Sequence, residues 1–285
     1  MTMKAVQQIM LGSVVKNERT AAEVLRSVKE AGYDGIELNG FMIRPTPLLV
    51  RALTRAAGMP SGAGGKLNWK ALIKEAGLRV VSVHEDLGTI KRDPDAVLRE
   101  ASDLGTDQVV ITGMYRFDYT DREAVDGLAR DLNEYGRILK DGGVELLYHN
   151  HNCELLRLKD GSGTRAYERL IEGTEPDRVG FEFDSYWFTE GGADALSWME
   201  RLGTRMKLWH INDRGTRQTG ASMTPILKSD SMELGYGNLP LERLSEAALK
   251  NGVRAVVLES HRNWAEGSPV KSLQLSAAFM NRMFS

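Results

Sequence analysis

The chain contains five histidines, and each lies at or just beyond the end of a short apolar run of the kind that forms a β-strand. Strand ends make up only about a tenth of a chain built from eight βα units, so random placement would rarely put all five there. The pattern therefore predicts a functional site at the strand ends. The histidines are His84, His149, His151, His210 and His261, after the runs 79–83, 144–148, 206–209 and 256–260.

Three successive predicted strands end in residues that divalent metals bind, namely Asp184, His210 and Glu259. A metal site needs a few imidazole and carboxylate ligands that converge from different strands, as neighbouring strand ends would provide. Two of these residues also have a plainer explanation, because Asp184 could cap the next helix and His210 could be a hydrogen-bonded buried histidine. Glu259 follows an apolar run and would be costly to bury without a partner, so the three together favour a metal site.

Further polar residues near the predicted strand ends are candidates for substrate binding or proton transfer. The segment His149-Asn150-His151 is ambiguous, because both rings reach one face if the strand continues, whereas a turn at Asn150 separates them. One ring could then bind metal and the other substrate. Glu154 follows closely enough to fold back into the site. The remaining candidates are Glu37, His84 and Arg214, while His261 suits a solvated rim position.

Cys153 is the only cysteine, which excludes an internal disulfide and fits a reducing cytoplasm. It lies near two histidines, as a nucleophile would, but nothing else in the chain forms a Cys/His/Asn arrangement, so we interpret it as a small loop residue. Four aromatic residues beside the predicted metal ligands could stack on a sugar, although core packing is the favoured interpretation. They are Tyr186, Trp187, Phe188 and Trp209.

The elements that would position these residues alternate between short β-rich runs and longer helical segments, which is typical of βαβ units. Eight such runs in 285 residues give about 36 residues per unit, the size of one βα repeat. The sequence therefore predicts a single α/β domain over residues 1–285, a (β/α)8 TIM barrel with loop extensions at about 41–67 and 215–238 over its C-terminal face. The predicted strands are Gln8–Val15, Gly35–Asn39, Leu78–His84, Gln108–Thr112, Val144–His149, Val179–Asp184, Met206–His210 and Arg254–Glu259.

Composition argues against several classes of protein. A hydrophobic fraction of 42% and a charged fraction of 27% are typical of an ordinary globular protein. The net charge of -2 provides no basic face for a nucleic acid. No run approaches the roughly 18 apolar residues that a membrane span needs, and the first residues are too polar for a secretion signal. A cytoplasmic location is therefore expected, without nucleic acid or membrane as a partner.

Seven short motifs, in this order and at this spacing, resemble the xylose isomerase-like TIM barrels, also called the sugar phosphate isomerase/epimerase family. The resemblance covers essentially the whole chain. Each motif alone is weak, but together they are specific to the superfamily, though not to one reaction. They are Gly32-Tyr-Asp-Gly-Ile-Glu-Leu38, Val83-His84, Tyr148-His-Asn-His151 with Glu154, Phe181-Glu-Phe-Asp-Ser-Tyr-Trp187 with Gly191-Gly192, Trp209-His-Ile-Asn-Asp-Arg214, Gly235-Tyr-Gly-Asn238 and Val257-Leu-Glu-Ser260.

The resemblance implies a divalent metal held by a carboxylate from strand five, an aspartate from strand six, a histidine from strand seven and a glutamate from strand eight. The last three positions fall on Asp184, His210 and Glu259. Strand five departs from the pattern, because His149 stands where many isomerases and epimerases have glutamate. Either His149 is the fourth ligand or Glu154 supplies the carboxylate from the loop. Mn2+ is the expected ion, with Co2+, Mg2+ or Zn2+ as alternatives.

The implied activity is that of a metal-dependent isomerase or epimerase of carbohydrate metabolism, which removes a proton next to the carbonyl of a sugar or keto sugar and stabilises an enediolate. The expected partner is thus a small-molecule sugar, and assembly into a homo-oligomer is left open. The catalytic candidates are His149, Glu154 and Glu259, and the substrate-binding candidates are Glu37, His84, His151 and Arg214.

The main alternative is a keto-sugar lyase or dehydratase, inosose-dehydratase-like or cleaving 3-keto-glycosides. Histidine on strand five breaks the two-carboxylate arrangement of the epimerases, and an imidazole beside a carboxylate suits β-elimination. In addition, Tyr148-His-Asn-His151 is similar to the Tyr-His-Pro-His of inosose-dehydratase-like proteins. More remote alternatives are an endonuclease IV-like repair enzyme and a non-catalytic sugar-binding barrel.

Overall fold

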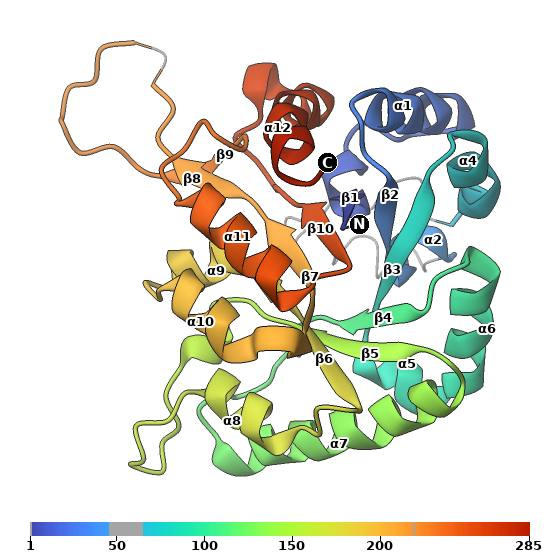
Figure 1. Ribbon diagram of the computed structural model, residues 1–285, viewed down its shortest axis with the longest axis vertical. Coiled ribbons are helices and arrows are strands. Elements are labelled where there is room, and N and C mark those ends of the chain that lie inside the picture. Colours follow the sequence, from blue (N-terminus) through green and yellow to red (C-terminus); the bar gives the residue numbers. More distant parts are fainter. Residues whose placement is uncertain (1, 46–64, 219) are drawn as a thin grey trace. The chain divides into compact units, whose positions relative to one another are not determined.

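The computed structural model describes residues 2–45, 65–218 and 220–285 of the chain (Figure 1). By the contacts among its residues the chain divides into two compact units. The first contains Met1–Arg79, His210–Glu246 and Ala255–Ser285, and the second contains Val80–Trp209 and Ala247–Arg254. Strands β3 (Arg79–Glu85) and β7 (Met206–Ile211) and helix α11 (Leu241–Asn251) each have residues in both units.

The first unit combines segments from both ends of the sequence. Its strands are β1 (Met3–Gln7), β2 (Gly35–Asn39), β8 (Asp213–Gly215), β9 (Asp230–Met232) and β10 (Ala255–Leu258). Its described helices are α1 (Glu18–Glu30), α2 (Gly40–Ile43), α4 (Trp69–Glu75) and α12 (Pro269–Met283), with 3-10 helices η1 (Gln8–Leu11) and η4 (Ala265–Gly267). Strand β1 pairs in parallel with both β10 and β2, so that Gln7 stands opposite Glu37.

The second unit alternates strands and helices along one stretch of chain. Its strands are β3 (Arg79–Glu85), β4 (Gln108–Ile111), β5 (Glu145–His149) and β6 (Val179–Asp184), which pair in parallel in that order. Its helices are α5 (Leu87–Arg92), α6 (Pro94–Leu104), α7 (Arg122–Asp141), α8 (Ala166–Gly173), α9 (Ser185–Glu190) and α10 (Ala195–Leu202), with 3-10 helices η2 (Cys153–Leu155) and η3 (Gly203–Arg205).

The strand order β1-β10-β7-β6-β5-β4-β3-β2 closes on itself, and β8 and β9 form a separate two-stranded sheet. The predicted eight-stranded parallel barrel is therefore confirmed. Seven of the eight predicted strands begin and end within one residue of the observed ones. The prediction of one domain over residues 1–285 stays a prediction. Of its two loop extensions, most of 41–67 lies outside the described residues, and 215–238 contains β9, which pairs antiparallel with β8.

The first predicted strand, Gln8–Val15, was placed wrongly. The strand is Met3–Gln7, and the chain then turns into the 3-10 helix η1. The cause is side-chain competition for backbone groups, because Oε1 of Gln7 accepts the backbone N–H of Ile9 at 2.7 Å and so caps η1. Oε1 of Gln8 accepts the backbone N–H of Asn39 at 2.8 Å, which ties the turn to the end of β2.

Helix α1 shows how the helices of the first unit are bounded and docked. It begins after Asn17, whose side chain accepts the backbone N–H of Thr20 at 3.0 Å. It ends before Gly32, whose φ of +100° is a conformation that glycine adopts readily. A side chain at Gly32 would meet Asn281 of α12, because an added Cβ would lie 2.7 Å from its amide nitrogen. The buried side of α1 thus packs closely on α12 (Figure 1).

In the second unit, the alternation of side chains along β6 separates packing from chemistry. Phe181 and Phe183 point to one face, and the Phe181 ring lies 5.6 Å from that of Tyr167 in α8. Glu182 and Asp184 point to the other face, and both are buried. Strand β5 stands beside β6 with His149 opposite Glu182, so the pairing register brings an imidazole next to a carboxylate.

None of the helices in the described ranges is both long and apolar enough to cross a membrane.

Candidate functional site

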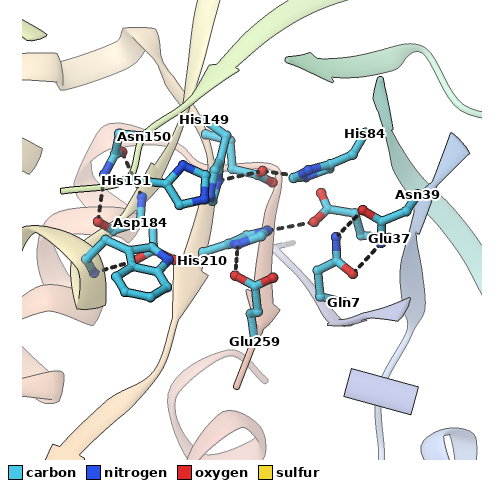
Figure 2. A network of polar contacts seen from close by, with 12 residues as sticks. Gln7, Glu37, Asn39, His84, His149, Asn150, His151, Asp184, His210 and Glu259 are labelled. Carbon is cyan, nitrogen blue, oxygen red and sulfur yellow. Dashed lines mark hydrogen bonds and ion pairs between the residues drawn. The ribbon is translucent and has the colours of Figure 1, made fainter. Parts of the chain in front are cut away.

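The first unit contains a buried group, here called the His210 cluster, made of Glu37, His210 and Glu259 (Figure 2). Glu37 comes from β2, His210 from β7, and Glu259 directly follows β10. Nε2 of His210 lies 2.6 Å from Oε1 of Glu37, and Nδ1 lies 3.0 Å from Oε2 of Glu259. Both nitrogens of a fully buried imidazole therefore face carboxylate oxygens.

His261 lies at the edge of this cluster. Its Nε2 is 3.7 Å from Oε2 of Glu259, and its side chain is 38% exposed. The structure thus gives it the rim position that the sequence suggested.

The second unit contains a corresponding group, the His149 cluster, made of His84, His149 and Glu182. Figure 2 shows the two histidines of this group. Oε2 of Glu182 lies 2.8 Å from Nε2 of His84 and 3.2 Å from Nδ1 of His149. The three side chains are 5%, 2% and 0% exposed, so this contact is shielded from water.

Glu182 was given no role by the sequence analysis, although a signal was present. It interrupts the apolar run of β6 two residues before Asp184, and the period of two along a strand sends both side chains to the same face. A carboxylate in the middle of a buried strand is costly unless it has a partner. An acidic residue inside an otherwise apolar strand is therefore the sequence signal that indicates Glu182.

Asp184 is the N-cap of α9, because its Oδ1 accepts the backbone N–H of Trp187 at 2.7 Å. The plainer expectation for this residue is therefore confirmed. Capping uses one of two carboxylate oxygens, so a role as metal ligand stays a prediction. The side chain of Asn150, a contact that the sequence analysis also missed, holds the backbone of Asp184. The Asn150 amide nitrogen donates to the Asp184 carbonyl at 3.0 Å, and the Asn150 amide oxygen accepts the Asp184 N–H at 3.0 Å.

Strand β5 ends at His149, and His151 lies beyond the turn at Asn150. The His151 ring nevertheless stays close to that of His149, with centroids 5.0 Å apart. On its other side, the ring of Trp187 lies at 5.8 Å. Trp187 is half-buried and contacts a site histidine. The other three aromatic residues, Tyr186, Phe188 and Trp209, are buried, as the core interpretation predicted.

Glu154 is fully buried and makes a different set of contacts. Its Oε1 accepts the Tyr148 hydroxyl at 2.7 Å, and its Oε2 accepts the backbone N–H of His151 at 2.9 Å. Within residues 2–45, 65–218 and 220–285, the His, Cys, Asp and Glu groups that could hold a metal do not include Glu154.

Cys153 donates its thiol to Oε2 of Glu154 at 3.2 Å. Burial, reinforced by the charge of Glu154, raises the pKa of the Cys153 thiol well above its usual range. The thiolate needed for nucleophilic chemistry is therefore disfavoured, in agreement with its interpretation as a loop residue.

Arg214 lies in β8, half-buried, and its backbone is held by a residue that the sequence analysis did not single out. The carboxylate of the adjacent Asp213 accepts four backbone N–H groups, from Arg214, Gly235, Gly237 and Leu239, at 2.7 to 3.1 Å. The Gly-Tyr-Gly-Asn segment is thereby folded onto β8, next to the residue proposed to bind substrate.

The chemistry of these side chains fits a divalent cation. The His210 cluster places two buried carboxylates against one buried imidazole. Buried carboxylates need a compensating positive charge, and imidazole with carboxylate is a ligand set that Mn2+ and Zn2+ accept. The buried His, Asp and Glu side chains at these strand ends could therefore bind a metal ion.

The sequence profile of the xylose isomerase-like TIM barrel family matches residues 25–283. The chain therefore belongs to this family.

Among sequence relatives, an inosose dehydratase from Mesomycoplasma hyopneumoniae (strain J) is 24% identical over 208 residues. The match covers 67% of this chain and 61% of the relative, so the chain spans less than two thirds of that protein's length.

Among the solved structures that share the fold are the following two. A sugar phosphate isomerase/epimerase from Parabacteroides distasonis ATCC 8503 is 21% identical, with a TM-score of 0.74 over 98% of this chain and 94% of that chain. The IolI protein with a bound zinc atom is 14% identical, with a TM-score of 0.68 over 100% of both chains. At these identities the likeness concerns the fold alone.

Proposed function

We propose that this chain is a divalent-metal-dependent enzyme that removes a proton next to the carbonyl of a small keto sugar or keto-cyclitol and eliminates water from it. The family fold and the names of its relatives, an inosose dehydratase and a sugar phosphate isomerase/epimerase, support a small polyhydroxylated substrate. The observation that supports elimination is the residue at the end of β5. This residue is a histidine, His149, and not a glutamate, and its Nδ1 lies 3.2 Å from Oε2 of Glu182.

For the metal we propose Asp184, His210 and Glu259 as ligands, with His149 rather than Glu154 as the fourth. Asp184 and His149 end β6 and β5, His210 is the penultimate residue of β7, and Glu259 follows β10; these strands are consecutive in the barrel order. All four are buried. The position of Glu182 supports the choice, because Nδ1 of His149 faces this carboxylate at 3.2 Å and Nε2 is then the nitrogen left to bind the metal.

When bound, the metal would polarise the substrate carbonyl and acidify the neighbouring C–H group. Glu259 is the proposed base that accepts the carbon-bound proton, and the electron pair of the broken C–H bond forms the new C=C bond. His84 is the proposed acid that protonates the leaving hydroxyl, which departs as water. In this role His84 would act as an imidazolium, with Nε2–H facing Oε2 of Glu182 at 2.8 Å and the transferred proton on Nδ1.

Three further side chains are proposed to bind the substrate hydroxyl groups. Glu37 is fixed by its 2.6 Å contact with His210, and His151 by its position between His149 and Trp187. The third is Arg214, whose backbone N–H donates to the carboxylate of the preceding residue, Asp213, at 2.7 Å.

A second candidate is an isomerase or epimerase, which the His210 cluster favours. Glu37 and Glu259 contact opposite nitrogens of His210, and two carboxylates of this kind could remove and return a proton. The two candidates share the first chemical step and differ in whether a hydroxyl group leaves.

The deciding experiment is incubation of Mn2+-loaded protein with ketoses, inososes and 3-keto-glycosides in D2O. Elimination predicts an unsaturated product with loss of water or of the glycosidic alcohol. Deuterium incorporation without such a loss would instead assign the isomerase or epimerase activity. If neither occurs and the protein binds no divalent metal, the proposed function is refuted.

The His210→Ala variant tests the metal assignment. We expect the variant to fold but to lose stoichiometric metal binding and turnover, because the substitution removes a proposed metal ligand. The removed imidazole also lies between the carboxylates of Glu37 and Glu259. Asp177→Asn is the matched control, since Asp177 is an exposed residue that pairs with Lys140 on the surface. Retained turnover in the His210→Ala variant would refute the assignment.

A further inference from the structure

We propose that Glu154 is a positioning residue, which holds the turn after β5 so that the His151 ring stays between His149 and Trp187. The assignment of His151 to the substrate rests on the proposed function, whereas the positioning itself does not. Glu154 is 0% exposed, so its carboxylate acts inside the protein and not as a solvated surface charge.

Three hydrogen-bond donors to the Glu154 carboxylate lie on residues 148–153, just before Glu154 in the sequence. The hydroxyl of Tyr148, at the penultimate position of β5, donates to Oε1 at 2.7 Å. The backbone N–H of His151 and the thiol of Cys153 donate to Oε2 at 2.9 and 3.2 Å. One buried carboxylate thus bonds the strand before the turn and the backbone after it, which fixes the path between His149 and His151.

The hydrogen bonds extend in one direction into the loop after β4. The backbone N–H of Met114 donates to the Tyr119 hydroxyl at 2.9 Å, and the Tyr119 and Tyr148 oxygens are 3.0 Å apart. Since Tyr148 uses its only hydrogen for Glu154, Tyr119 must be the donor in that contact. Burial and the charge of Glu154 raise the pKa of Tyr119, so its hydroxyl remains a protonated donor.

Gly113 provides the space for this network. Its backbone does not have a positive φ, so glycine is not needed there for conformation. An added Cβ would lie 3.2 Å from the Tyr119 oxygen, 3.3 Å from Oε1 of Glu154 and 3.3 Å from Nδ1 of His151. A methyl group at this position would push on Glu154 and His151 together without removing any hydrogen-bonding group.

Three variants separate positioning from metal ligation. Glu154→Gln keeps an oxygen for the His151 N–H and an amide that can donate to Tyr148. Glu154→Leu removes both acceptors at similar volume. Gly113→Ala keeps every hydrogen-bond partner and displaces the network, so it tests the proposal even if Glu154→Leu fails to fold.

The first readout needs neither metal nor substrate. With five histidines in the chain, the imidazole Cε1–H signals of the metal-free protein can be assigned by NMR. We expect the His151 signal to move in Gly113→Ala and Glu154→Leu and to return close to its wild-type position in Glu154→Gln, with His261 as the unmoved reference. An unmoved His151 signal in both Gly113→Ala and Glu154→Leu would overturn the proposal.

The second readout is the ratio of kinetic effects together with metal affinity. We expect Gly113→Ala and Glu154→Leu to raise KM by about tenfold, the effect of a misplaced binding group, with a smaller change in kcat. Glu154→Gln should bind Mn2+ within about threefold of wild type, whereas Asp184→Asn should lose it. Loss of Mn2+ from Glu154→Gln would make Glu154 a ligand and overturn the positioning role. If the wild-type protein does not bind Mn2+, the proposed function is refuted, whereas the NMR measurement still tests the positioning role of Glu154.

Discussion

Oε2 of Glu182 lies 3.2 Å from Nδ1 of His149, and the two residues stand directly opposite each other in neighbouring parallel strands. The same oxygen lies 2.8 Å from Nε2 of His84. One buried carboxylate therefore determines which nitrogen of each ring faces away from it, and that choice decides which nitrogen is presented to a ligand.

Glu182→Gln tests this relationship. We expect metal affinity to fall by about tenfold or more, because a neutral amide holds the two imidazoles less strongly than a carboxylate does. The measurement is a Mn2+ titration in competition with a chelator. Glu145→Gln is the matched control, since Glu145 begins β5 and its side chain is 33% exposed. Equal affinities of the two variants would contradict the orienting role of Glu182.

Metal should stabilise the fold, because an ion that binds the folded protein and not the unfolded chain shifts the equilibrium towards the folded state. A site held at about 100 times its Kd gains about 2.7 kcal/mol, which corresponds to roughly 5–10 °C in Tm for a chain of this size. Thermal unfolding of chelator-treated protein with and without Mn2+ measures the shift. The His210→Ala variant should show no shift, and an equal shift in that variant would place the metal elsewhere.

Asp213→Asn should destabilise the first unit. Its carboxylate accepts four backbone N–H groups, and an amide would turn two of these contacts into opposed donors. We expect the free energy of unfolding to fall by about 2 kcal/mol, as measured by urea denaturation. Asp230→Asn, which removes an exposed ion pair with Arg262, should cost less than about 0.5 kcal/mol. Similar losses in both variants would argue against Asp213 as an anchor.

Cys153 should react slowly with iodoacetamide in the folded protein. Its pKa is raised by burial and by Glu154, so less thiolate is present at any given pH than for an ordinary cysteine. We expect alkylation at pH 8 to be at least about tenfold slower than in urea-unfolded protein, as followed by mass spectrometry. A rate equal to that of the unfolded chain would show that the thiol is activated and would reopen its role as a nucleophile.

The sequence by itself determined the barrel and the positions of most of the candidate residues. Strand-forming runs, glycine-bounded helix ends and the count of βα units are local properties, so they can be read without knowing what each segment packs against. The ends of β5, β6 and β7 were predicted for the same reason, since an apolar run that stops at His149, Asp184 or His210 is visible in the chain.

Only the tertiary structure decided which of these residues contact each other. The pairing of His149 with Glu182 depends on the register of β5 and β6, which no local pattern specifies. Gln8, in the segment predicted as the first strand, instead accepts the backbone N–H of Asn39, a residue 31 positions away. Glu154 has the residue type of a ligand, yet the turn after β5 directs its carboxylate to Tyr148 and the His151 backbone. These contacts join groups that are distant along the chain or that are brought together by the course of a loop, so they form only when the chain folds.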